Sequence, residues 1–226
     1  MKKLILSVLA CCTLPAHGQE ADVRMEIVTI ALEQPVYGLF FDNGGEIARF
    51  QAIPTGLGQP LKYHGPRRFI LRTSEADFSR TTRLPPPHAW VDLPTDSDRV
   101  LLACLKRGDA PVKMLAYDIG RARISAGDYR FFNFSRSPLA IMIGERRLRV
   151  GSGEDTLVSH PSWGREVGEI DVAVAVIGDD RTRPVYSSQW GNRPGRRNFV
   201  FMFDGPHDYN PIRIARFFDV LPADAE

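Results

Sequence analysis

Short apolar stretches rich in Val, Ile, Phe and Tyr recur along the chain, and no stretch of helical length repeats its apolar residues every 3.6 positions. Such stretches are typical of β-strands. We predict strands at Met25–Leu32, Val36–Phe41, Phe69–Leu71, Val100–Leu105, Val112–Tyr117, Tyr129–Phe134, Leu139–Ile143, Ile170–Ile177, Val185–Trp190, Phe199–Phe203 and Ile212–Val220.

Turn-forming residues separate these stretches, for example in Asp42-Asn43-Gly44-Gly45 and in Gly178-Asp179-Asp180. Gly accepts positive φ angles, and Asp and Asn initiate turns. Short strands at regular spacing predict an all-β protein with a β-sandwich architecture.

The order of strands and turns repeats about halfway along the chain. Val36–Phe41 is joined by a Gly turn to Glu46–Ile53, just as Leu139–Ile143 is joined by a Gly turn to Arg146–Val150. The closing strands correspond as well, Val100–Leu105 with Phe199–Phe203 and Val112–Tyr117 with Ile212–Val220. A repeating unit of roughly 100 residues has the usual size of one β-sandwich domain.

The fold class predicted from this repeat is two tandem immunoglobulin-like β-sandwich domains that arose by internal duplication. We place the N-terminal domain at residues 19–118, a linker at 119–128 and the C-terminal domain at 129–222. Because the linker is short, we expect the two domains to pack against each other and to bury part of their apolar surface.

Residues 1–18 have the features of a cleaved secretory signal peptide: a basic start, about 12 mostly apolar residues and the small residues of Ala16-His17-Gly18. The apolar stretch is shorter than the ~20 residues that cross a membrane as a helix, and no other stretch approaches that length. The protein is therefore expected to be exported, periplasmic or extracellular. An alternative interpretation places a lipoprotein anchor on Cys11.

Removal of Lys2 and Lys3 with the signal peptide changes the 29 basic and 27 acidic residues to 27 of each. A neutral protein is not expected to bind nucleic acid. The arginine doublets Arg67-Arg68, Arg146-Arg147 and Arg196-Arg197 are interpreted as solvated strand faces that protect sheet edges. Cys104 would be the one cysteine left, and its apolar surroundings predict a buried core residue.

The sequence shows no coherent catalytic or metal site, and no cofactor is predicted. No His lies within ten residues of Cys104, as a type I copper site would require, and His64, His88, His160 and His207 are isolated in loop-like sequence. The segment Asp204–Asn210 carries oxygen ligands but lacks the spacing of a calcium loop, so a hairpin loop is favoured. Gly151-Ser152-Gly153 lacks the spacing of a nucleophile elbow and is interpreted as a turn.

Trp90, Trp163 and Trp190 are the candidate ligand-binding residues. All three lie near Pro or Gly at predicted strand ends, where exposed rings could stack on sugars. The other interpretation is that these rings close the end of a sandwich core or lie between domains. A hydrolase site in the groove between the domains is a further alternative, because catalytic groups can converge from separate loops.

The chain resembles a loosely defined family of exported bacterial β-sandwich proteins of unknown function. The resemblance rests on Val36–Phe40, Tyr129–Ser135, Pro138–Gly144, Tyr186–Trp190 and Arg196–Phe201. These motifs are structural, so the resemblance implies a fold and export but no catalytic residues. The leading hypothesis is a non-enzymatic structural or interaction module of the cell envelope that binds a protein partner at edge strands or arginine-rich faces.

Overall fold

The computed structural model describes residues 22–79, 84–160, 162–163, 165 and 167–221, and these residues form an all-β structure. The strands of the first half are β1 (Asp22–Ala31), β2 (Val36–Asn43), β3 (Glu46–Ala52), β4 (Leu61–Pro66), β5 (Arg68–Leu71), β6 (Ala89–Asp92), β7 (Arg99–Leu105) and β8 (Lys113–Asp118). Those of the second half are β9 (Tyr129–Asn133), β10 (Leu139–Ile143), β11 (Arg146–Val150), β12 (Asp155–Val158), β13 (Gly168–Ile177), β14 (Thr182–Asn192), β15 (Arg196–His207) and β16 (Asn210–Val220). A 3-10 turn, Glu75–Asp77, lies where an acidic turn follows β5.

The two halves, residues 22–118 and 129–221, have the same strand order. One sheet of the first half runs β4-β1-β7-β8, and one sheet of the second half runs β12-β9-β15-β16, which is the same order with eight added to every number. Each has a parallel pair at its centre, β1 with β7 and β9 with β15, and antiparallel pairs at its edges.

The remaining strands of each half also correspond. In the second half they form one sheet, β11-β10-β13-β14. In the first half β2 pairs with β3 and β5 with β6, and two backbone hydrogen bonds of 2.9 Å between Phe40 and Arg72 join the pairs in the order β3-β2-β5-β6. Gly44 and Gly144 occupy the equivalent hairpin turns, and both have the positive φ that favours glycine, 68° and 54°.

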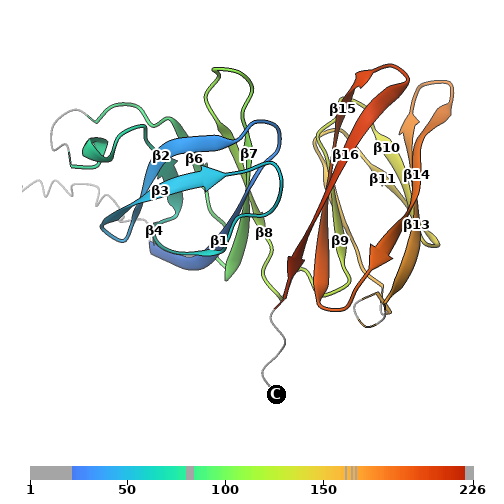
Figure 1. Cartoon of the computed structure of the whole chain (residues 1–226), viewed down its shortest axis with the longest axis horizontal. Coiled ribbons are helices and arrows are strands. Elements are labelled where there is room, and N and C mark those ends of the chain that lie inside the picture. Colours follow the sequence, from blue (N-terminus) through green and yellow to red (C-terminus); the bar gives the residue numbers. More distant parts are fainter. Residues whose placement is uncertain (1–21, 80–83, 161, 164, 166, 222–226) are drawn as a thin grey trace, which may run out of the picture.

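Four layers lie along the long axis of the molecule: β2 and β3, the β1-containing sheet, the β15-containing sheet, and the β13-containing sheet (Figure 1). One apolar core fills the space between the two layers of each half. This stacking of sheets is consistent with the predicted β-sandwich architecture.

A third apolar core lies between the halves. It joins Val28 and Leu101 of the first half to Phe199 and Phe201 of the second, and it includes Ile119 and Ile124 from the connecting segment. The two inner sheets are therefore buried on both faces, which explains why β7 and β15 contain continuous rather than alternating apolar residues. The halves pack against each other as the short linker predicted.

All the strand ranges predicted from the sequence are strands in the structure, but β4, β6 and β12 were not predicted. β4 alternates buried and exposed residues, yet it ends in Gly65-Pro66, and these residue types are normally read as a turn. β12 has only four residues. β4 and β12 are edge strands in equivalent positions, and β6, also four residues long, pairs with β5 alone among the described strands. Each has few apolar side chains to mark it.

The predicted signal peptide, residues 1–18, and the alternative lipid anchor at Cys11 lie outside the described residues. In the part of the chain that is described, no helix has the length and apolar character needed to cross a membrane.

Candidate functional site

The three tryptophans occupy two different environments. Trp90, on β6, is 52% exposed, and the Arg68 guanidinium lies 4.6 Å from its ring centre. Trp163 and Trp190 are only 8% and 5% exposed, so the expectation that these two rings would be exposed stacking surfaces is wrong. Both pack on Tyr129 in the core of the second half, with ring centres 5.5 and 6.0 Å away. These two rings therefore belong to the apolar core of the second half.

Groups capable of nucleophilic or metal chemistry are dispersed. His160 Nδ1 lies 2.9 Å from Ser162 Oγ, but the contact is local and exposed. No group of three His, Cys, Asp or Glu side chains that could hold a metal ion occurs among the described residues. Cys104 is buried as predicted, and burial raises the pKa of its thiol to about 12, so it is a poor nucleophile.

Two loops that were candidates for chemistry have structural roles. Asp204–Asn210 belongs to the β15–β16 hairpin, as predicted, with His207 paired to Asn210, and the Asp204 carboxylate binds Arg136. Ser152 lies in a turn, where its hydroxyl donates a hydrogen bond of 2.6 Å to the Ser135 carbonyl.

A groove of about 670 Å³ runs between the halves beside β8 and β12. Its charged side chains are paired: Arg130 Nε lies 2.7 Å from Asp155, and Arg123 Nε lies 3.2 Å from Asp118. The described residues that line it include no His, Ser or Cys. The groove therefore lacks the base and nucleophile that a hydrolase of the serine or cysteine type would need there.

Asp118 has a lowered pKa because of its hydrogen bonds. Burial, the largest influence, raises this pKa, but the combined hydrogen bonds from Ser97 Oγ (2.6 Å), the Gly120 N–H (2.9 Å) and Arg123 outweigh it. A carboxylate with a depressed pKa stabilises the fold above its unfolded pKa of about 3.9, and the contribution is lost as the pH falls through the folded value.

We therefore expect Asp118→Asn to lower the free energy of unfolding at pH 7 and to have a smaller effect below about pH 4. Urea denaturation at a series of pH values measures this difference. Asp92→Asn is the surface comparison. Hydrogen bonding to Arg68 also lowers the pKa of Asp92, but this pair lies at the protein surface, where salt screens the interaction. An Asp118→Asn effect that stays constant down to pH ~3 would contradict the assignment.

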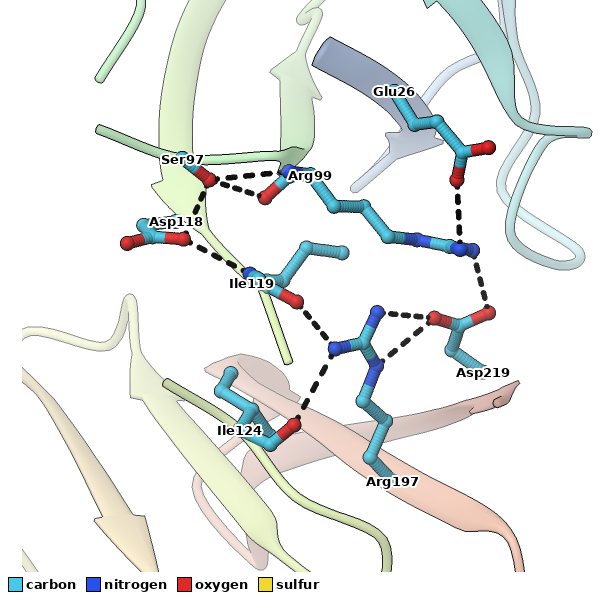
Figure 2. Close-up of polar contacts among 9 residues, drawn as sticks. Glu26, Ser97, Arg99, Asp118, Ile119, Ile124, Arg197 and Asp219 are labelled. Atoms are coloured by element: carbon cyan, nitrogen blue, oxygen red, sulfur yellow. Dashed lines mark hydrogen bonds and ion pairs between the residues drawn. The ribbon is translucent and has the colours of Figure 1, made fainter. Parts of the chain in front are cut away.

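A buried arginine links the halves. Arg197, on β15, is 0% exposed. The prediction that the doublet Arg196-Arg197 is solvated is therefore wrong for Arg197. Its Nε and Nη2 donate to Asp219 Oδ2 on β16 at 2.9 and 2.7 Å, and its Nη1 donates to the Ile119 carbonyl in the connecting segment, directly after β8 (Figure 2). Removing a guanidinium from water is unfavourable unless its donors are satisfied, and here they are.

The network extends into the first half through Arg99 on β7. Its Nη2 donates to Asp219 Oδ1 at 3.0 Å, and its Nη1 donates to Glu26 of β1 at 2.9 Å (Figure 2). Asp219 therefore accepts hydrogen bonds from arginines of both halves. Burial, the largest influence, lowers the pKa of Arg197, and the bonds to Asp219 oppose that shift. We interpret this network of hydrogen-bonded ion pairs as a polar contact that holds the two inner sheets together.

Tyr129, on β9, carries a buried hydroxyl with no hydrogen-bond partner among the described residues. We expect Tyr129→Phe to leave stability unchanged or raise it by up to ~1 kcal/mol, because it removes an unsatisfied polar group. Tyr63→Phe is the matched control, since the buried Tyr63 hydroxyl donates to the Pro66 carbonyl at 2.8 Å, and its loss should cost about 1 kcal/mol. Thermal unfolding of both variants measures the contrast. Equal destabilisation by the two would show that the Tyr129 hydroxyl is hydrogen-bonded in solution.

β16 is an edge of its sheet, and β15 is its one paired neighbour among the described strands. Its stretch Ile212–Val220 contains no Pro or Gly, and this nine-residue stretch is longer than the proline-free part of any other described edge strand. By contrast, Pro184 and a register shift interrupt the edge strand β14, and β11 carries three arginines in five residues. Interruptions and dense charge are the usual protection of sheet edges.

Arginines lie on aromatic rings along this edge. Arg213 of β16 lies 4.6 Å from the ring centre of Phe203, Arg216 lies 4.9 Å from that of Trp190, and Arg196 lies 4.1 Å from that of Phe218. None of these three arginines is ion-paired with a carboxylate of the described residues. The edge therefore presents cationic groups whose positions are restrained by their contact with rings.

No protein-family model matches the chain, and no curated protein matches it in sequence. The assignment of function therefore rests on the geometry of the molecule.

Proposed function

We propose that this protein is an exported, non-enzymatic interaction module of the cell envelope that binds a protein partner through a free sheet edge. It would consist of two tandem immunoglobulin-like domains, residues 19–118 and 129–222, with the linker 119–128 between them, produced by internal duplication. The matching strand order of the two halves supports the duplication. Export follows from the signal peptide predicted at residues 1–18, and the resemblance to exported β-sandwich proteins agrees with it.

The observation that carries the proposal is the contrast between the β16 edge and two other polar regions, the groove and the contact between the inner sheets. In the groove and between the inner sheets, the charged side chains bind one another. At β16 the outer side of the backbone has no paired strand, and the arginines beside it have no carboxylate partner among the described residues. An extended segment of another protein can bind such an edge by adding a strand to the sheet.

The test is to capture partners with the purified protein from an envelope fraction, to identify them, and to measure binding of each purified candidate by calorimetry. We expect one candidate to bind directly, with saturation at a defined ratio. A purified protein that binds no envelope protein and instead turns over a small substrate would overturn the proposal.

Carbohydrate binding is a second candidate function because Trp90 presents one ring face to solvent. It predicts glycan-array binding that disappears in Trp90→Ala while the melting temperature is unchanged. Trp163 and Trp190 are too buried to stack on a sugar without opening the core of the second half. An array with no positive glycan would exclude this function for the sugars tested.

A further inference from the structure

The side chains along β16 restrict what can bind there. In a strand, side chains alternate between the two faces, so Arg216 and Phe218 share one face, and Arg213 lies on the other. The contacts agree with this alternation, because Ile212 and Ile214 pack in the core of the second half, while Ala215 and Phe217 pack in the core between the halves. A strand added at this edge would meet cationic groups on both of its faces.

We propose that the β16 edge binds an extended acidic segment of a partner protein, in which two carboxylates are three residues apart and an apolar residue lies two positions beyond one of them. This inference rests on the proposed function and specifies the chemistry of the partner. The carboxylates stand opposite Arg213 and Arg216, and the apolar residue stands opposite Phe218. Either strand direction satisfies this spacing, because only the order of the three residues is reversed.

Charge complementarity selects this occupant. Arg213 and Arg216 are exposed, have no ion pair among the described residues and lie on the rings of Phe203 and Trp190. A guanidinium that already lies on a ring loses less rotamer freedom when it binds a carboxylate. Opposite charges directly across a strand pair stabilise the pair, and like charges destabilise it.

A second copy of this chain fits the edge less well. Antiparallel self-pairing about the middle of Ile212–Val220 places Arg216 next to its own counterpart, and like charges in that position repel. The exposed Phe218 and Val220 would add apolar contact in either case, so the charges decide between the two occupants.

The probe is a capped peptide of about ten residues built from Thr and Val with two Glu residues three positions apart. A control peptide of identical composition has its Glu residues two apart, which places both carboxylates on one face and out of reach of one arginine. A second control carries N-methyl groups on alternate amides, which prevent hydrogen bonding to β16. We expect the first peptide to bind at least about tenfold more tightly than either control in calorimetry.

Charge reversal tests the site. The double variant Arg213→Glu with Arg216→Glu should weaken binding of the probe about tenfold or more. Arg213→Glu alone leaves Arg216 in place over the Trp190 ring and should show part of that loss in affinity. Arg146→Glu with Arg147→Glu, on the edge strand β11, is the matched control and should not change binding. The melting temperature of each variant shows that it is folded.

Several results would overturn the inference. Equal binding of both Glu spacings, or of dextran sulfate, would show an unspecific anion surface. A dimer that sediments as one species and excludes the peptide would show that a second copy occupies β16. If an identified envelope partner binds equally well to the charge-reversed variant, the inference fails and the proposed function stands. If the peptide binds as expected but no envelope partner exists, the site stands and the proposed function fails.

Discussion

Replacing Asp219 by Ala should destabilise the protein by about 3–5 kcal/mol. The carboxylate accepts three hydrogen bonds of 2.7–3.0 Å, two from Arg197 and one from Arg99. Without it, two guanidinium groups of like charge remain close together beneath the protein surface, and Arg197 has no access to water. An uncompensated buried charge is among the most unfavourable results of a single substitution.

Asp204→Ala is the control for this prediction. Asp204 is also an aspartate of the β15–β16 hairpin bound to an arginine, at 2.9 Å, but the side chain of that arginine, Arg136, is 89% exposed. Its loss should cost about 1 kcal/mol or less. Urea denaturation at neutral pH compares the two variants, and equal costs would mean that the Arg197 network is hydrated in solution.

The pair itself need not add to stability, although breaking it is costly. The double variant Arg197→Met with Asp219→Leu should therefore be more stable than Asp219→Ala alone, because no uncompensated charge remains at Arg197. A double variant that is less stable than the single one would show that the hydrogen bonds to the Ile119 and Ile124 carbonyls contribute more than the ion pair.

The apolar pattern was sufficient to predict the strands in which buried residues form a continuous run. Val100–Cys104 and Phe199–Phe203 were recognisable because both of their faces are buried. The equivalent edge strands β4 and β12 were not, because a strand that is short or ends in Pro has no pattern that distinguishes it from a loop. The correspondence between halves was visible from strand order, and β4 and β12 complete it.

The burial of Arg197 could not be predicted from its own surroundings in sequence. The doublet Arg196-Arg197 looks like the other doublets, and burial follows from the packing of two halves against each other. One signal was available: the predicted β15–β16 hairpin pairs Arg197 with Asp219, so an arginine and an aspartate face each other across neighbouring strands. That register identifies a pair but does not show whether water reaches it.

Whether each tryptophan ring is buried or exposed could not be predicted from its position in the sequence either. Trp90 and Trp190 lie near the ends of β6 and β14, whereas Trp163 lies in a turn between β12 and β13. Proximity to a turn does not distinguish a ring that packs in a core from a ring that faces solvent. Trp163 is placed over Tyr129 by the loop before β13, whereas Trp90 lies on the short strand β6, where one ring face stays open. Only the packing of the sheets separates these cases.

Phe201→Ala should cost about 3–5 kcal/mol, as large-to-small substitutions of fully buried aromatic residues do. Phe201 of β15 lies in the core between the halves. Its ring is stacked on that of Phe132 with ring centres 4.8 Å apart, and its ring centre lies 6.0 Å from that of Phe217. The substitution leaves a cavity between two sheets that belong to different halves. It should therefore weaken the coupling of their unfolding as well as their stability.

Tryptophan fluorescence separates the two halves, because Trp90 belongs to the first and Trp163 and Trp190 to the second. In Trp90→Phe, fluorescence follows only the second half, and calorimetry follows both. We expect the fluorescence and calorimetric transitions to coincide in Trp90→Phe and to separate when Phe201→Ala is added to it. Phe69→Ala, in the core of the first half, is the matched control: it should lower stability by a similar amount and leave the transitions coincident.

Coincident transitions in Phe201→Ala, with a loss below ~1 kcal/mol, would contradict a packed interface between the halves. The predicted separation would instead show that the halves are held together by the core between their inner sheets. Since Phe217 and Asp219 of β16 contribute to that contact, the interface also holds one face of β16 in place. Opening the interface should then weaken binding of an acidic segment at the β16 edge even though no arginine of that edge has been changed.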